Sequence, residues 1–329
     1  MAHDLPNALR QAIAEHTGSL ANGLAEARSE LTAGYRSGAA SRIAMTSQRH
    51  IAAYLIARLP ATYAAVAAAL ERLAGQWSGF APKSLFDAGC GPGTGLFAAL
   101  VAFPSLDQLA GLDRDAALIE VARDLVTRSG LAGDRPVTFT TDDLARPGLA
   151  LAPADLINCT YALVECDEDD IGRIAATLFA AARQALVLVE PGTPAGFERL
   201  RAARTALIGQ GAQILAPCPH QSACPITAPD WCHFSVRLAR SRDHRRLKDA
   251  DAPFEDEKFS YLIAARAPGA NQTGGRILRP PRHGKAGSRF DLCTDAGNIQ
   301  SRTVPARDRT LHRSVRDLVW GDFLPEVPD

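Results

Sequence analysis

Residues 84–95 read Ser-Leu-Phe-Asp-Ala-Gly-Cys-Gly-Pro-Gly-Thr-Gly, and the apolar run 96–101 follows them directly. This pattern predicts a short strand, a glycine-rich turn and a helix. Such a turn lets backbone N–H groups approach a ligand closely. The spacing Gly89-x-Gly91-x-Gly93 is not the dinucleotide pattern G-x-G-x-x-G, and no Gly-Lys-Ser/Thr follows as in a phosphate-binding P-loop.

Strands and helices alternate on the C-terminal side of this turn. The sequence predicts strands at 108–112, 137–141, 155–159 and 185–190, and helices at 116–127, 171–184 and 197–209. The alternation indicates an α/β fold with a doubly wound parallel sheet covered on both faces.

The flanking segments have different compositions. Residues 1–80 read as helical, with a break at Pro60. After residue 212 we expect a Cys-rich insertion with a loop at 217–229, a basic helical segment at 237–248, a strand at 258–266, a loop at 268–287 and a terminal β-hairpin at 288–304. The predicted divisions are therefore a helical segment (1–80), a core (81–212) and a Cys-rich C-terminal part that completes the sheet (213–329).

The composition is that of an ordinary globular protein, since 47% of the 329 residues are hydrophobic and 22% are charged. No apolar run approaches the roughly 20 residues that span a membrane. The first residues lack the basic and then apolar order of a secretory signal. We expect a cytoplasmic protein that is monomeric when free and has no membrane contact.

The net charge of zero conceals an asymmetry along the chain. Residues 1–195 carry 15 basic against 21 acidic side chains, whereas 237–316 carry 18 against 9. A basic C-terminal part suggests a polyanionic partner such as RNA, with a solvated basic face as the alternative. The candidate RNA contacts are Arg237, Arg240, Arg242, Arg245, Arg246, Lys248, Arg276, Arg279, Arg282 and Lys285.

Two acids next to the glycine turn suit a nucleoside ligand. Asp113 ends the second strand, where its carboxylate can accept both ribose hydroxyls, and Asp87 can hold the ammonium of an amino acid. The stretch LFDAGCGPGTG resembles motif I of the class I S-adenosylmethionine-dependent methyltransferases, which have a Rossmann-like fold. The resemblance implies that Gly89, Gly91 and Gly93 face the methionine part of the cofactor. It also implies that Asp113 holds the ribose and that Asp142 lies by the adenine amino group.

The segment after the fourth strand should face the methyl acceptor. Asn158 and Tyr161 match the ends of the Asn-Pro-Pro-Tyr tetrapeptide of amino-methylating enzymes, but Cys159-Thr160 replaces both prolines. Cys159 could serve as a thiolate nucleophile, or it could be a buried packing residue like Cys90 and Cys166. The sequence names no catalytic residue.

Four cysteines in the C-terminal part form a candidate metal site. Cys218, Cys224, Cys232 and Cys293 have the spacing C-x5-C-x7-C-x60-C. Four thiolates fit either a structural Zn²⁺ or an iron–sulfur cluster. The wide spacing and the adjacent prolines favour a larger [4Fe–4S] cluster. His220 and His233 are further candidates for a mixed site.

Over about 40–325 the chain resembles the methyltransferase-like proteins of the mitochondrial ribosomal small subunit and their bacterial relatives. The segments LVEPGTPAGFERLRAAR and PDWCHFSVRLARSRDHRRLKDADAPFEDEKFSYLIAAR carry this resemblance together with the glycine turn. It implies a four-cysteine iron–sulfur cluster and association with the ribosomal small subunit during assembly. Two further possibilities stay open: an RNA methyltransferase or a binding factor without turnover. A small-molecule methyltransferase is a third.

Overall fold

The computed structural model describes residues 3–18, 24, 26–27, 29–30, 47–248, 251–267 and 273–326. The described α-helices are α1 (Asn7–Thr17), α3 (Gln48–Ala57), α4 (Leu59–Gln76), α5 (Thr94–Ala102), α6 (Ala116–Ser129), α7 (Ile171–Ala181), α8 (Pro194–Gly209), α9 (Arg242–Lys248) and α10 (Arg309–Val315). The strands are β1 (Ser84–Ala88), β2 (Gln108–Asp113), β3 (Val137–Thr141), β4 (Ala154–Thr160), β5 (Ala182–Pro191), β6 (Gln213–Ala216), β7 (Phe234–Ala239), β8 (Phe254–Ala265), β9 (Gly274–Ile277), β10 (Arg282–Gly284), β11 (Gly287–Thr294), β12 (Ile299–Pro305) and β13 (Phe323–Pro325).

The central sheet has the strand order β3-β2-β1-β4-β5-β8-β6, and β7 pairs with β8. Strands β1 to β5 are parallel to their neighbours, whereas β8 runs antiparallel to both β5 and β6. The chain reverses its direction of progress between β1 and β4, and ligands of open α/β sheets bind at the carboxyl ends of such strands. The predicted doubly wound α/β fold is confirmed.

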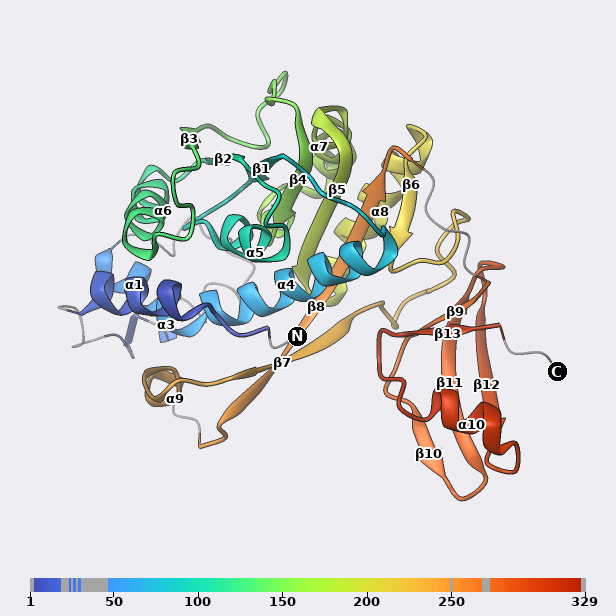
Figure 1. The fold of residues 1–329 in the computed structure, drawn as a ribbon. Coiled ribbons are helices and arrows are strands. Elements are labelled where there is room, and N and C mark those ends of the chain that lie inside the picture. Colours follow the sequence, from blue (N-terminus) through green and yellow to red (C-terminus); the bar gives the residue numbers. More distant parts are fainter. Residues whose placement is uncertain are drawn as a thin grey trace.

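Helices cover both faces of this sheet (Figure 1). Successive residues of a strand point to opposite faces, and here both sets are apolar, so each face packs against helices. Leu85, Leu156 and Val187 pack in one hydrophobic core with side chains of α4 and α5. The neighbouring residues Phe86 and Ile157 pack in a second core with side chains of α7 and α8.

The N-terminal helices break where the sequence predicts a break. α3 ends at Ala57 and α4 begins at Leu59, with Pro60 in its first turn, and the two helices are bent by 48°. Proline is tolerated there because the first N–H groups of a helix lack partners within it. In the described residues no single helix is long and apolar enough to cross a membrane; α3 and α4 pass that test only as a bent pair.

A two-stranded ribbon leaves the central sheet towards α9 (Figure 1). It consists of β7 and the first half of β8, which pair antiparallel from Phe234↔Phe259 to Ala239↔Phe254. The expected helix at 237–248 is therefore wrong in its first part, since Arg237 lies in β7 and only Arg242–Lys248 are helical.

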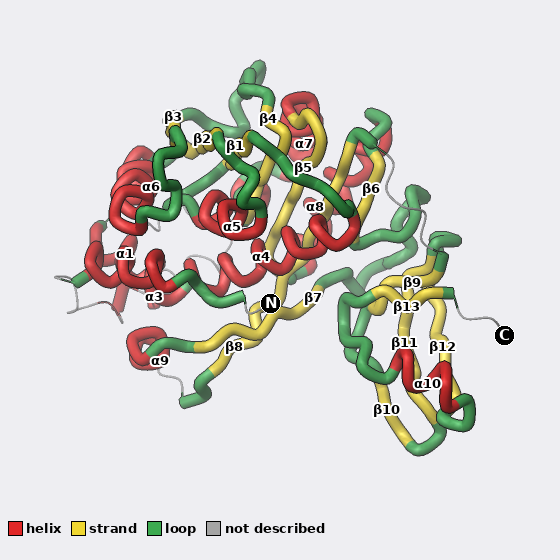
Figure 2. Tube along the Cα trace, in the orientation of Figure 1, coloured by secondary structure: helices red, strands yellow, loops and turns green. Residues whose placement is uncertain are grey.

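The last strands build a second, five-stranded sheet, visible apart from the central one in Figure 2. The predicted hairpin is confirmed, because β11 pairs antiparallel with β12. The expected loop at 268–287 is wrong in part, since it contains β9 and β10; residues 268–272 lie outside the described residues. The strand β6, which sequence analysis did not predict, joins the central sheet before the cysteine loop.

Candidate functional site

The glycine turn between β1 and α5 adopts a backbone that favours glycine. Gly89, Gly91 and Gly93 have φ angles of 70°, 50° and 87°. The N–H groups of Gly89 and Cys90 donate to the carbonyl of Leu112 at 2.7 and 2.9 Å, which fixes the turn to β2. A Cβ on Gly91 would meet no atom within 4 Å, so open space adjoins the turn at that residue.

Asp87 is buried beneath this turn with one carboxylate oxygen left over. Its Oδ2 accepts the N–H of Leu96 at 2.9 Å, whereas its Oδ1 is buried without a hydrogen-bond partner. Burial raises the pKa of Asp87 to about 7, although the Leu96 N–H opposes this change. An unpaired buried acceptor is costly, and a ligand ammonium would satisfy it.

Asp113 and Asp142 follow on the two neighbouring strands. Asp113 accepts the N–H groups of Gly91 at 2.7 Å and Asp115 at 2.9 Å, and burial raises its pKa against the effect of these hydrogen bonds. Asp142 forms a two-pronged ion pair with Arg146, at 2.7 and 2.8 Å, which lowers its pKa. The three predicted acids therefore lie at the carboxyl ends of β1, β2 and β3.

The segment after β4 is held by side chains that sequence analysis missed. Tyr161 has a φ of 56° and donates its hydroxyl to Oε1 of Glu257 at 3.1 Å. Arg58 forms an ion pair with Glu257 at 2.9 Å, and its guanidinium lies over the Tyr161 ring, 5.2 Å from the centroid. Cys159 is fully buried, and burial raises the pKa of its thiol well above the ordinary value, so it is a packing residue here.

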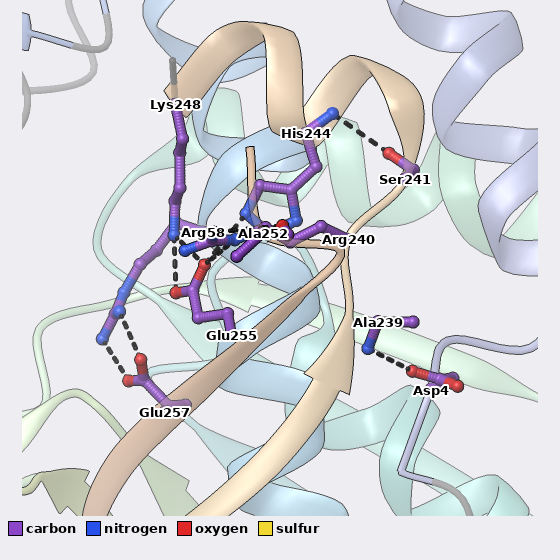
Figure 3. A network of polar contacts seen from close by, with 10 residues as sticks. All are labelled: Asp4, Arg58, Ala239, Arg240, Ser241, His244, Lys248, Ala252, Glu255 and Glu257. Carbon is purple, nitrogen blue, oxygen red and sulfur yellow. Dashed lines mark hydrogen bonds and ion pairs between the residues drawn. The ribbon is translucent and has the colours of Figure 1, made fainter. Parts of the chain in front are cut away.

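Further polar contacts lie close by on the ribbon, around Glu255 (Figure 3). Glu255 accepts Lys248 at 2.6 Å and Arg240 at 3.0 Å, and His244 lies 3.4 Å away. Burial alone would raise the pKa of Glu255, but hydrogen bonds from His244, Lys248 and Arg240 hold it well below its usual range. A second group of ion pairs, centred on Glu255, therefore lies two residues along β8 from Glu257.

The four cysteines of the C-terminal part line one cavity. It lies between α8, the loop after β6, the middle of β8 and the second sheet. Cys218, Cys224, Cys232 and Cys293 all lie on its wall, together with Ile226 and Leu278. The sequence separates Cys293 from the other three, and the pairing of β11 with β9 brings it back to them.

The thiols in this cavity resist ionisation. Burial, together with smaller contributions from Cys218 and Cys224, raises the pKa of Cys293 to about 12, although Arg204 and Arg276 oppose the change. Burial also raises the pKa of Cys218, while the guanidinium groups of Arg204 and Arg276 oppose the change. When a metal ion binds such thiols, it displaces their protons and is held by the thiolates. Across the described part of the chain, no three His, Cys, Asp or Glu side chains have the geometry that could hold a metal ion, so the ligand set stays a prediction.

The two candidate histidines have different surroundings. Nε2 of His220 lies 3.4 Å from the Sγ of Cys293, and burial lowers the histidine pKa, which keeps the ring neutral. His233 is stacked on Trp231 with the centroids 4.9 Å apart and meets Trp320 edge-on. His220 is therefore in contact with the cysteine site, whereas His233 packs in an aromatic group.

The strand order of the central sheet defines a protein with the class I methyltransferase fold. The chain belongs to the family described as mitochondrial small ribosomal subunit Rsm22, whose model matches residues 48–325.

The chain is 30% identical over 294 residues to the human ribosome assembly protein METTL17, mitochondrial, covering 83% of this chain and 62% of that protein. It is 25% identical to the Rsm22-cox11 tandem protein 2, mitochondrial, of Schizosaccharomyces pombe, covering 84% of this chain and 43% of that protein. The chain thus spans less than two thirds of the length of these relatives.

Solved structures show lower similarity. Magnesium protoporphyrin IX methyltransferase from Synechocystis has a TM-score of 0.41 and 17% identity, over 63% of this chain and 79% of that chain. The pyocyanin biosynthetic protein PhzM has a TM-score of 0.38 and 20% identity, over 71% and 61%. The fold class stands on the strand order of the central sheet.

The expected cytoplasmic location is wrong. The human and fission yeast relatives are both named as mitochondrial proteins, and so is the matching family. The expectation rested on the first residues of the chain, which lack a secretory signal and do not report on other destinations.

Proposed function

We propose that this chain is a methyltransferase-like factor that binds S-adenosylmethionine and a [4Fe–4S] cluster and acts with small-subunit ribosomal RNA during assembly. The observation that carries the proposal is the meeting of four cysteines, from two distant segments, on one cavity against a methyltransferase-type core. The names of the family and of the human relative support the ribosomal part.

The glycine turn supports the cofactor. The unpaired Oδ1 of Asp87 would accept the ammonium of the methionine part, and open space adjoins the same turn at Gly91. Asp113 would hold the ribose and Asp142 the adenine amino group. When bound, S-adenosylmethionine supplies a methyl group on a sulfonium. Calorimetric titration of the protein with S-adenosylmethionine tests this part, and no heat of binding would refute it.

The cysteine cavity supports the cluster, with Cys218, Cys224, Cys232 and Cys293 as its four ligands. A [4Fe–4S] cluster bound by thiolates supplies iron that can accept an electron. Protein purified without oxygen should be brown and contain about four irons per chain. A Cys→Ser change at any of the four positions should remove the colour. Cys166→Ser is the matched control, because Cys166 is a half-buried thiol outside the cavity.

Zinc is the alternative occupant of the same ligands. Colourless protein that holds one zinc and no iron would replace the cluster by zinc but keep the four cysteines. Protein that holds neither metal would refute the site.

The basic residues support an RNA contact, but only some of those proposed from the sequence are available. Arg237 pairs with Asp256 at 2.7 Å, Arg282 pairs with Asp291 at 2.6 Å, and Arg240 and Lys248 both pair with Glu255. Arg279 pairs with Asp230, and Arg276 is buried. No ion pair is formed within the described residues by four exposed candidates: Arg242, Arg245, Arg246 and Lys285.

We therefore expect α9 to contribute to RNA binding. Binding of small-subunit RNA should weaken steeply with salt, because contacts to phosphates release counterions. The double variant Arg245→Ala, Arg246→Ala should reduce the slope of log K against log[salt] by about 2. Arg237→Ala, a paired arginine of the adjoining strand, is the control and should leave the slope close to that of the wild type. Equal slopes for the double variant and the wild type would favour a solvated basic face.

Two activities remain for the cofactor site. The locked Tyr161 segment supports a binding factor, since its hydroxyl and ring are already engaged by Glu257 and Arg58. The intact glycine turn supports methyl transfer to RNA. A turnover assay with labelled methyl donor on immature small subunits decides between them: incorporated label supports the enzyme, and its absence with bound cofactor supports the binding factor.

A further inference from the structure

Two arginines lie almost completely buried in the wall of the four-cysteine cavity. Arg204 on α8 is 5% exposed and Arg276 on β9 is 2% exposed, and both line the cavity. Removing a guanidinium from water costs several kcal/mol unless an anion compensates for it. No carboxylate forms an ion pair with either arginine among the residues that the structure describes.

Among the described residues, the contacts of these arginines include no anion; the Arg276 guanidinium lies over the Phe323 ring, 5.4 Å from its centroid. Arg276 donates Nε to the carbonyl of Pro217 at 2.9 Å and Nη1 to the carbonyl of Gly321 at 3.0 Å. Arg204 donates Nη2 to the carbonyl of His220 at 2.8 Å, and its Nε is buried with no partner at all. Carbonyl groups satisfy N–H donors but carry no net charge. The cavity wall therefore presents two cations and one unused donor.

An anion inside the cavity would balance the two positive charges and could accept the unused Nε–H of Arg204. Among the described residues, no buried carboxylate lines the cavity: Asp87 and Glu190 hydrogen-bond to backbone N–H groups at the carboxyl edge of the central sheet, and Glu257 pairs with Arg58. The remaining groups on the cavity wall that can become anionic are the Tyr261 phenol, whose pKa is raised by burial, and the four thiols. As neutral thiols they cannot balance two guanidinium groups, whereas thiolates around a metal group can.

We propose that Arg204 and Arg276 are the charge partners of the metal group in this cavity and hold its reduction potential at a higher value than the apolar surroundings alone would allow. The inference rests on the proposed four-cysteine cluster. A [4Fe–4S] cluster with four thiolates is anionic, and reduction adds one more negative charge. Fixed positive charges in a poorly screened cavity stabilise the reduced form more than the oxidised form.

The test measures the midpoint potential of the cluster in anaerobically purified full-length protein. Arg204→Gln removes one charge, and the potential should shift to a more negative value. Arg204→Lys keeps the charge but loses the planar fork, so the potential should stay near that of the wild type. Arg266→Gln is the control, because Arg266 also donates only to backbone carbonyls, those of Ala182, Phe179 and Ala180, and is an exposed residue outside the cavity.

Each outcome decides a different statement. An unchanged potential in Arg204→Gln with full iron content overturns the charge role and leaves the cluster standing. Colourless wild-type protein overturns the cluster proposal and this inference with it. If Arg204→Gln loses its iron, the lysine variant decides: retained iron supports the charge role, and equal loss shows that the arginine serves only to hold the loop at His220.

Discussion

The unpaired oxygen of Asp87 should make the proposed binding of S-adenosylmethionine depend on pH. The carboxyl has a pKa of about 7 in the folded protein because it is buried, so it is largely protonated at pH 6. A ligand ammonium binds the ionised form. The ionised fraction rises from about one in eleven at pH 6 to one half at pH 7, so affinity for S-adenosylmethionine should increase about fivefold, or ~1 kcal/mol.

Calorimetric titrations at pH 6 and 7 measure this change. The bound ligand should release a proton from Asp87, and the observed heat should therefore depend on the ionisation enthalpy of the buffer. Asp87→Asn should bind more weakly by about 1.5–3 kcal/mol at pH 7, the range for a lost hydrogen bond to a charged group, and should lose the pH dependence. Asp142→Asn is the control. Arg146 lowers the pKa of Asp142, so this carboxyl stays ionised from pH 6 to 7 and its replacement should leave the pH dependence in place.

Two results would refute this reasoning. Affinity that is equal at pH 6 and 7 would mean that Asp87 does not meet the ligand ammonium. A pH dependence that persists in Asp87→Asn would place the titrating group elsewhere, with Asp113 as the first candidate because burial raises its pKa as well.

Further changes test the same region. Asp113→Ala should weaken S-adenosylmethionine binding by roughly 1.5–3 kcal/mol in calorimetry, and unchanged affinity would remove Asp113 from the ribose. Gly89→Ala should lower the free energy of unfolding by about 2–5 kcal/mol in urea, because the left-handed backbone is strained and the new Cβ would lie 2.4 Å from Ala162 Cβ. Gly91→Ala has the backbone strain alone and should cost about 1–2 kcal/mol; equal losses would contradict the contact. Burial raises the pKa of Glu190 to about 8 from 4.5, so its contribution to stability is complete below pH 4.5 and is lost as the pH rises through 8. The melting temperature should fall over that range, and Glu190→Gln should flatten the fall; parallel curves would exclude Glu190 as its source.

The central fold could be predicted because its signals are local. The glycine turn, Pro60 and the apolar strands each specify the backbone within a few residues, and they appear close to where the sequence places them. The helix expected at 171–184 is wrong at its end, since α7 stops at Ala181 and β5 begins at Ala182. β9 and β10 have four and three residues and contain glycine and arginine, so they show no apolar alternation. Their pairing with β11 stabilises them, and that pairing is invisible in the segment itself.

The charged residues show the limit of counting along the chain. An excess of basic side chains predicts a basic surface, but Arg237, Arg240 and Arg282 are neutralised by acids 9 to 19 residues away. The contact of Arg58 with Glu257 joins residues 199 positions apart. Arg204 could not be assigned to the cysteine cavity from the sequence, because it lies on the preceding helix and reaches the cavity only after the loop has folded back.

The fourth cysteine determines when the cavity can exist during synthesis of the chain. A ribosome makes Cys218, Cys224 and Cys232 first, and Cys293 follows 61 residues after the third. Until β11 has emerged and paired with β9, a growing chain has only three of the cavity cysteines, and the side of the cavity formed by the second sheet is missing. Only a chain whose second sheet has formed could enclose a metal group with all four cysteines, so a bound metal would distinguish such a chain from one that ends before β11.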